Sequence, residues 1–256
     1  MGNESPARTL AVAGAVAIVC AILVSTAVTV LRPYQLAYAA VDRNRSILRS
    51  AQIVDATAPV PDRVVVSEFL ELEPRLVDLE SGTFTAIADA RTYDYETALG
   101  NETELLPISA SADIAKIGAK PRVMPLYVSP ASGRVTLPFF GRGMWSTISG
   151  YLTLEPDLDT IAGLDIYSHG ETPGIGDRIQ NPEWLDRWRG KRVYDASGRV
   201  ALRVGDSGGN PGLANEYRID AITGATRTVD GLEASLLFWL GPDGFGPILD
   251  TLRNTD

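Results

Sequence analysis

Two short stretches of small residues are the strongest candidates for chemistry in this chain. The first, Thr223-Gly224-Ala225-Thr226, forms a turn directly before an expected helix. The N-terminus of a helix offers free backbone N–H groups and the positive end of the helix dipole, which favour a phosphate nearby. The second, Gly170 to Gly176, holds three glycines and a proline, and glycine lets backbone N–H groups approach a planar ring or a phosphate closely. Taken separately, each stretch also has the composition of an ordinary turn.

The residue types that are scarce exclude several kinds of chemistry. The chain has one cysteine, Cys20, and one histidine, His169. An iron–sulfur cluster or a structural zinc site needs about four thiolate or imidazole ligands. We therefore expect no metal site. If the protein moves electrons, an organic cofactor must do so.

One further motif has the composition of a protease active site. Gly205 to Gly209 reads Gly-Asp-Ser-Gly-Gly, the nucleophile motif of chymotrypsin-like proteases. That chemistry needs a histidine base beside the serine and an aspartate behind it. His169 lies only a few dozen residues upstream, in a Ser-His-Gly context that differs from the Ala-His-Cys of those proteases. We interpret the motif as a turn before Asn210-Pro211-Gly212.

Composition and charge bound the class of protein. The 256 residues suit one domain plus an anchor. The net charge of -9 argues against a general nucleic-acid binder, because such a protein needs a basic face. We therefore expect no nucleic-acid partner.

One N-terminal segment has the length of a membrane span. From Thr9 to Leu31 no residue is charged, and Arg8 and Arg32 bracket the run. As a helix it would extend over roughly 34 Å, enough for a bilayer core of about 30 Å. A cleaved signal peptide is the alternative, but the run is too long and lacks a clear small-x-small cleavage site. The segment therefore predicts a single transmembrane helix.

The elements that must position the two candidate stretches follow from periodicity and from the positions of glycine and proline. Pro33 is expected to kink the exit from the span, with a second, polar helix from Tyr34 to Ala51 and a linker from Thr57 to Pro61. Short helices are predicted at 183–189 and 231–240. Glycines 141, 143 and 150 are expected to divide the segment after residue 139 into short elements. Strands are predicted at 64–66, 69–70, 76–79, 123–128, 134–139, 153–155, 160–168 and 200–204. The fold class is therefore α+β.

In combination, these stretches resemble a known family. Asp220 to Thr226 (DAITGAT) resembles the D-x-x-[ST]-G-A-T signature on which one class of respiratory protein carries covalent FMN. Over nearly its whole length the chain resembles the C-subunit of the Na+-translocating NADH:quinone reductase. Further stretches match in order and spacing, at 31–33 (LRP), 44–48 (NRSIL), 73–84 (EPRLVDLESGTF), 137–146 (LPFFGRGMWS), 170–176 (GETPGIG), 181–184 (NPEW) and 190–194 (GKRVY).

The resemblance implies FMN as the cofactor, held covalently through a phosphodiester to Thr226. A threonine hydroxyl is not acidic and does not take up a phosphate ester spontaneously, so a flavin transferase that uses FAD would be required. The chain departs from the family pattern at two positions, where Thr223 replaces the commoner serine and Ile175 replaces a commoner leucine. Each replacement keeps the chemical type of the side chain, a hydroxyl in the first case and an aliphatic group in the second. Trp145 is implied to lie beside the flavin ring, and the alternative is that its side chain packs in the hydrophobic core. The residues implied to lie along the flavin are Glu171, Thr172, Pro173, Gly174, Ile175, Thr223, Gly224, Ala225 and Trp145.

The same resemblance implies the organisation and the role of the chain. It implies a cytoplasmic N-terminus at 1–8, a transmembrane helix at 9–31, a membrane-proximal helix and linker at 32–60 and one α+β FMN-binding domain at 61–256. The partners would be the lipid bilayer, the transferase and the other subunits of a Na+-pumping enzyme. The flavin would relay electrons between a membrane iron centre and another flavin subunit, so no side chain of this chain is expected to be catalytic. The chain alone is not expected to oxidise NADH, because no G-x-G-x-x-G fingerprint follows a strand.

Two alternatives remain open at this point. The FMN subunit of the related Rnf-type ferredoxin:NAD oxidoreductase shares the anchor and the threonine motif, although the stretches at 73–84 and 181–184 favour the quinone reductase. The other alternative is a structural assembly subunit without flavin.

The side of the membrane is predicted differently by charge and by resemblance. Arg32, Arg43, Arg45 and Arg49 follow the span, and only Arg8 and the α-amino group precede it. The positive-inside rule therefore predicts a cytoplasmic domain. The family implies the bacterial inner membrane, with the flavin domain on the periplasmic side. We follow the resemblance, because it covers the whole domain.

Overall fold

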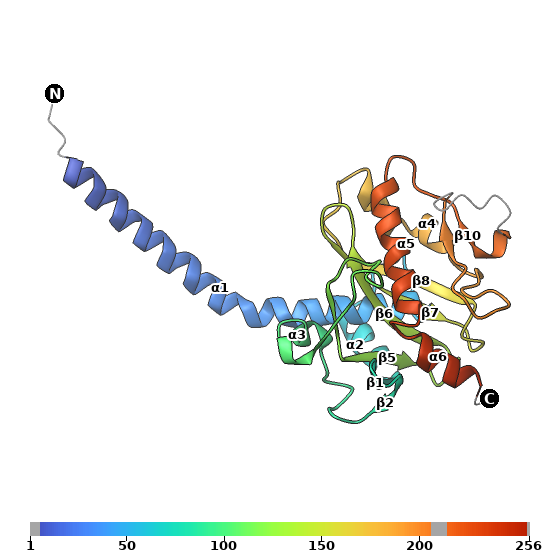
Figure 1. Ribbon diagram of the computed structural model, residues 1–256. Coiled ribbons are helices and arrows are strands. Elements are labelled where there is room, and N and C mark those ends of the chain that lie inside the picture. Colours follow the sequence, from blue (N-terminus) through green and yellow to red (C-terminus); the bar gives the residue numbers. More distant parts are fainter. Residues whose placement is uncertain (1–5, 206–213, 255–256) are drawn as a thin grey trace. The chain divides into compact units, whose positions relative to one another are not determined.

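The structure is a computed structural model that describes residues 6–205 and 214–254 (Figure 1). The chain divides into two compact units, Met1–Arg43 and Asn44–Asp256. Except for Gly205, the Gly-Asp-Ser-Gly-Gly motif, interpreted above as a turn, lies outside the described residues.

A single long helix, α1 (Pro6–Ser50), supplies the first unit and the beginning of the second. The expected separation into two helices at Pro33 is wrong, because the helix continues through this residue. Proline removes one N–H donor, but the alanine, leucine and glutamine residues that follow are good helix formers and keep their own hydrogen bonds. By length and composition the helix is suited to cross a membrane, which is compatible with a single-pass subunit.

The second unit is built on a six-stranded sheet in which every neighbouring pair is antiparallel. The spatial order is β2-β1-β5-β6-β7-β8. The strands are β1 (Glu73–Asp78), β2 (Thr83–Thr85), β5 (Val123–Val128), β6 (Val135–Arg142), β7 (Thr147–Leu154) and β8 (Ile161–Ser168).

Helices and small strand pairs complete this α+β unit, as the patterns predict. The helices are α2 (Asp62–Leu70), α3 (Tyr95–Ala98), α4 (Pro182–Asp186), α5 (Thr226–Leu240) and α6 (Gly246–Arg253), with 3-10 turns η1 (Glu102–Glu104), η2 (Gly176–Gln180) and η3 (Asn215–Tyr217). The antiparallel pair β3 (Leu105–Pro107) and β4 (Ala119–Pro121) and the parallel pair β9 (Arg203–Val204) and β10 (Arg218–Ile219) lie outside the main sheet.

One predicted strand region is a helix. Residues 64–70, expected to be extended, belong to α2. Val65 is fully buried, and the Phe69 ring lies 5.6 Å from that of Tyr127, measured between centroids. Residues four apart lie on one face of a helix, so both side chains reach the core together. This packing outweighs the preference of consecutive valines for strands.

Two glycines expected to interrupt the chain lie inside strands instead. Gly141 is in β6 and Gly150 in β7, and these strands pair along their whole length. A Cβ atom at Gly150 would lie 2.4 Å from the carbonyl oxygen of Asp165, and one at Gly141 would lie 2.0 Å from Ser235 Oγ. These glycines therefore permit close packing.

Helix α5 packs along β6 and carries one candidate stretch at its start (Figure 1). The Trp239 indole donates a hydrogen bond of 2.6 Å to the Phe140 carbonyl oxygen. Near the other end, a Cβ atom at Gly231 would lie 2.4 Å from the carbonyl oxygen of Arg142. The first turns of α5 therefore lie beside the end of β6, where the β6–β7 hairpin turn begins.

The last turn of α1 is attached to the same sheet by buried hydroxyl groups. The Thr153 hydroxyl donates to Ser50 Oγ over 3.0 Å, and the Thr136 and Thr153 hydroxyls lie 2.7 Å apart. A Cβ atom at Gly163 would lie 2.3 Å from the Ser50 carbonyl oxygen. The second unit therefore includes the end of α1 as part of its packing.

Candidate functional site

The centre of the candidate site is a buried carboxylate, that of Glu171, whose residue is 4% exposed. Its Oε1 accepts hydrogen bonds from the backbone N–H groups of Trp145 at 3.0 Å and Ser146 at 3.3 Å. Its Oε2 accepts from the Met144 N–H at 3.3 Å and from the Thr228 hydroxyl at 2.5 Å. One side chain thus joins the hairpin turn, the 170–176 loop and the start of α5.

Hydrogen bonding keeps this carboxylate ionised. Burial by itself raises the pKa of Glu171, but the Thr228 hydroxyl and the N–H groups of Trp145, Ser146 and Met144 outweigh burial and lower the pKa below its ordinary value. A carboxylate is a pure acceptor only when ionised. The four donors therefore match the charged form of the side chain at neutral pH.

The contacts around Glu171 need two residues without side chains. A Cβ atom at Gly143 would lie 2.6 Å from Glu171 Oε1. A Cβ atom at Gly176 would lie 2.9 Å from Glu171 Cβ and 3.0 Å from Thr228 Oγ1. Any side chain at these positions would separate the three segments.

The threonine turn lies at the start of α5. Gly224 has a φ of +84°, a left-handed conformation that favours glycine. Ala225 is buried as the residue preceding the helix, and Thr226 is the first helical residue and is exposed. The Asp220 carbonyl oxygen accepts a 2.8 Å hydrogen bond from the Trp184 indole, which fixes the chain before the turn. The N–H groups of the first helical turn have no partner within the helix, so the exposed Thr226 hydroxyl lies where a phosphate would be stabilised.

The structure distinguishes among the three threonines of this stretch. Thr223 and Thr226 are exposed, whereas Thr228 is 2% exposed and donates its hydroxyl to Glu171. Thr228 is therefore unavailable to a modifying enzyme, while the other two are accessible.

Apolar side chains are exposed on the two loops that Glu171 joins. Met144 is 43% exposed, Trp145 61% and Ile175 48%. Trp145 is therefore not a core aromatic. Beside Ile175, residues 172–174 are also exposed, and the Ile175 N–H closes this turn on the Thr172 carbonyl oxygen at 3.2 Å. We refer to the three exposed side chains of Met144, Trp145 and Ile175 as the apolar rim of the two loops.

Three residues that donate to Glu171 were not among the site residues predicted from the sequence. Thr228, Met144 and Ser146 reach Glu171 across 57, 27 and 25 positions of sequence. The Ser146 hydroxyl also accepts a 2.5 Å hydrogen bond from the Gly170 N–H, and His169 Nδ1 accepts from the Glu171 N–H at 3.1 Å. His169 therefore supports the loop. Two signals in the sequence could have found them, because Met144 and Ser146 belong to the matching stretch 137–146 and Thr228 follows Thr226 by two positions.

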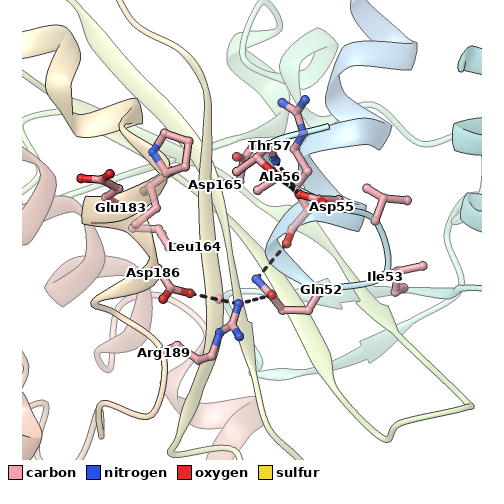
Figure 2. Close-up of a pocket in the computed structure, with 15 residues that line it drawn as sticks. Gln52, Ile53, Asp55, Ala56, Thr57, Leu164, Asp165, Glu183, Asp186 and Arg189 are labelled. Carbon is pink, nitrogen blue, oxygen red and sulfur yellow. Dashed lines mark hydrogen bonds and ion pairs between the residues drawn. The ribbon is translucent and has the colours of Figure 1, made fainter. Parts of the chain in front are cut away.

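A separate pocket of about 470 Å³ lies between the end of α1, the loop that follows it, β8 and α4 (Figure 2). At the edge of this pocket, the Arg189 guanidinium donates a hydrogen bond to the side-chain oxygen of Gln52 and forms an ion pair of 3.1 Å with Asp186. Asp165 is 8% exposed, and burial raises the pKa of its carboxyl to about 6. None of the flavin-site residues predicted from the sequence lines this pocket. Within residues 6–205 and 214–254, no cluster of histidine, cysteine, aspartate and glutamate is suited to a metal ion.

Comparison with known proteins identifies the family to which the chain is similar. Residues 143–241, from the hairpin turn to the end of α5, match the family model of the FMN-binding domain. The C-subunit of the Na(+)-translocating NADH-quinone reductase of Yersinia pestis is 34% identical over 98% of this chain and 94% of its own length. The subunits of the same name from Vibrio alginolyticus and Pseudomonas aeruginosa are 35% and 36% identical, each over 98% of this chain and 97% of their own length.

Solved structures of similar proteins share the fold. NqrC of Shewanella oneidensis superposes with a TM-score of 0.70 and 32% identity, over 82% of this chain and 96% of its own. The corresponding subunit from Parabacteroides distasonis gives a TM-score of 0.65 and 25% identity, over 86% and 96%. The resemblance inferred from the motifs is confirmed, because these relatives are named as C-subunits of the quinone reductase. The chain belongs to the C-subunit family of the Na+-translocating NADH-quinone reductase.

Proposed function

We propose that this chain carries one FMN, joined through its phosphate to Thr226, as an electron-transfer subunit of a Na+-pumping NADH:quinone oxidoreductase. The observation that carries the proposal is the exposed Thr226 hydroxyl at the first position of α5. It lies two residues before Thr228, which contacts the loop that bears Ile175.

The residues present fit such a group. The free N–H groups of a helix N-terminus suit a phosphate. The exposed apolar rim suits the faces of a planar aromatic ring, and Gly174, with a φ of +74° and no atom within 4 Å of a built Cβ, leaves open space beside it. Thr223, Gly224 and Ala225 would hold the phosphate end. Residues 172–175 with Trp145 would lie along the ring, and the buried Glu171 would lie beneath it.

Attachment requires a transferase and a nucleotide donor. The Thr226 oxygen would form a new bond to the FMN phosphorus of FAD, the pyrophosphate bond of FAD would break, AMP would leave, and the hydroxyl proton would pass to a base of the transferase. No base is needed from this chain. Exposure of Thr226 is the property that gives the transferase access.

The bound group would supply reversible one-electron chemistry, so that the chain relays electrons between a membrane iron centre and another flavin subunit. The chain's own contribution is binding and orientation. The relatives are named as subunits of one enzyme, so we propose the other subunits as partners. The apolar part of α1 would cross the lipid bilayer at 9–31, with 1–8 cytoplasmic, 32–60 leading to the domain, and the flavin domain at 61–256 on the periplasmic side.

Intact mass measurement tests the attachment. The full chain is coexpressed with a flavin transferase, denatured and weighed. The unmodified sequence is expected to gain the mass of one FMN. Thr226→Ala is expected to lose it, because the acceptor oxygen is gone, and Thr223→Ala is expected to retain at least part of it.

Two results would contradict the proposal. Full labelling of Thr226→Ala would place the flavin elsewhere. An unlabelled parent chain in the presence of an active transferase would favour a structural subunit without flavin. A related flavoprotein coexpressed with the same transferase shows that the enzyme is active.

A further inference from the structure

We propose that Glu171 is a positioning residue, whose carboxylate fixes the Met144–Ser146 segment against the first turn of the helix that carries Thr226. It would thereby set how the flavin ring is oriented relative to its phosphate anchor. This inference rests on the proposed function, and it gives Glu171 a role beneath the ring rather than in contact with it.

Burial is the first reason. Glu171 is 4% exposed, so it offers almost no surface to a ligand. Its neighbours on both loops are exposed, with Trp145 at 61% and Ile175 at 48%. Whatever lies on these loops touches the rim, and Glu171 acts on it through the residues that it holds.

The hydrogen-bond geometry is the second reason. Three consecutive backbone N–H groups, those of Met144, Trp145 and Ser146, converge on one carboxylate. Such a concave set of N–H groups binds an anion, and hydrogen bonds to an ionised acceptor are stronger than neutral ones. The backbone position of Trp145 is therefore set by Glu171.

The link to α5 is the third reason. The Thr228 hydroxyl donates to the same oxygen, Oε2, that accepts from Met144. Thr228 is buried in the first turn of α5, two residues after Thr226. The anchor point and the apolar rim are thus connected through one side chain.

A neutral amide cannot replace this acceptor. In Glu171→Gln one oxygen becomes an NH2 group, which donates and does not accept. At least one of the four donors then faces another donor and loses its partner. The variant nearly keeps the shape of the side chain, so its effect reports on hydrogen bonding and charge.

The first measurement needs no flavin. The full chain is produced in detergent without transferase, and amide hydrogen exchange is followed at Met144, Trp145 and Ser146. We expect at least about tenfold faster exchange at these positions in Glu171→Gln, because protection depends on the local hydrogen bonds. Glu183→Gln, at an exposed position of α4, is the matched control and should exchange as the parent does.

The second measurement uses the flavin-loaded chain. Glu171→Gln should retain the FMN mass, while visible circular dichroism of the flavin falls to less than half and its midpoint potential shifts. Thr228→Val removes only the link to α5. It should weaken the circular dichroism while exchange at residues 144–146 changes less than threefold. Thr228→Ser restores the hydroxyl and should restore the signal.

The results separate this inference from the proposed function. Unchanged exchange in Glu171→Gln would overturn the inference, and so would unchanged flavin spectra in both Glu171→Gln and Thr228→Val. An absence of flavin on the parent chain would instead overturn the proposed function, since the exchange experiment is carried out without flavin. If Glu171→Gln fails to fold, Thr228→Val with its Ser rescue decides the question.

Discussion

Thr226 and Thr228 lie two positions apart and have opposite environments. In an α-helix two residues correspond to a rotation of about 200°, so their side chains leave opposite sides of α5. Thr228 faces Glu171 and is 2% exposed, whereas Thr226 faces solvent. The periodicity of the helix therefore gives one threonine a structural contact and leaves the other accessible to a transferase.

Asp165 gives a residue-scale prediction about pH and stability. Burial raises its pKa to about 6 from 3.8, and the positive charge of Arg49 opposes this only in part. Between these values the folded protein holds a proton that the unfolded chain has lost. The contribution of Asp165 to stability is therefore fully present below about pH 4 and is lost as the pH rises to about 6, by at most about 3 kcal/mol.

The Asp165→Asn variant tests this. An amide does not titrate, so the loss of stability between pH 4 and pH 7 should be smaller than in the parent by about 1–3 kcal/mol. Urea unfolding of the full chain in detergent at both pH values gives the comparison. Asp186→Asn, at an exposed carboxylate of the same pocket (Figure 2), is the control. An equal pH dependence in parent and Asp165→Asn would show that Asp165 is not responsible.

At the scale of elements, the approach of α5 to β6 decides where the site forms. Gly231 faces the backbone of Arg142 and Gly143, and a Cβ atom there would lie 2.4 Å from the Arg142 carbonyl oxygen and 3.0 Å from Gly143 Cα. Both obstacles are backbone atoms. The helix or the strand end must therefore move to admit any side chain, and the hairpin turn at 143–146 would move with it.

Gly231→Ala should consequently lower the free energy of unfolding by about 1–3 kcal/mol, the usual range for an overpacked position, although alanine favours helices more than glycine does. Urea unfolding measures the change. Gly100→Ala is the matched control, because its Cβ would meet only the Thr97 carbonyl oxygen at 3.4 Å. A Gly231→Ala protein as stable as the parent would mean that α5 and β6 have room between them for a side chain.

At the scale of the whole molecule, the charges beside the apolar run bear on the side of the membrane that the domain occupies. Arg32, Arg43, Arg45 and Arg49 follow the run, which by the positive-inside rule favours a cytoplasmic domain. Two of these arginines have roles within the second unit. Arg45 pairs with Asp62 across 2.6 Å, and Arg49 lines the pocket beside Asp165. Their presence is explained by folding as well as by topology, which weakens the charge argument.

We predict that protease added to intact spheroplasts trims the full chain to a short N-terminal remnant, as expected for a periplasmic domain. Immunoblotting against tags at each end follows the cleavage. A cytoplasmic protein monitored in the same sample must stay intact, which controls for lysis. Survival of the domain until the membrane is lysed would show that the charge rule is right and the proposed location wrong.

The sequence by itself determined the local features of this protein. The uncharged run from Thr9 to Leu31 specified a helix of membrane-spanning length, and the strand at 123–128 was predicted with its observed bounds. The strand predicted at 160–168 matches β8 to within one residue, and the helix predicted at 231–240 has the observed C-terminal end of α5. These features depend on residues that are neighbours in the chain, through periodicity and turn chemistry.

Only the tertiary structure decided the features that depend on distant contacts. Residues 64–70 form a helix because Val65 is buried and Phe69, one helical turn later, packs against the Tyr127 ring. Gly150 lies within a strand because Asp165 and Phe139 occupy the space of a side chain. Glu171 was recognised from its motif, but its role follows from donors 25 to 57 positions away. No local pattern encodes such partners, because a buried carboxylate is stable only when the fold brings enough hydrogen-bond donors to it.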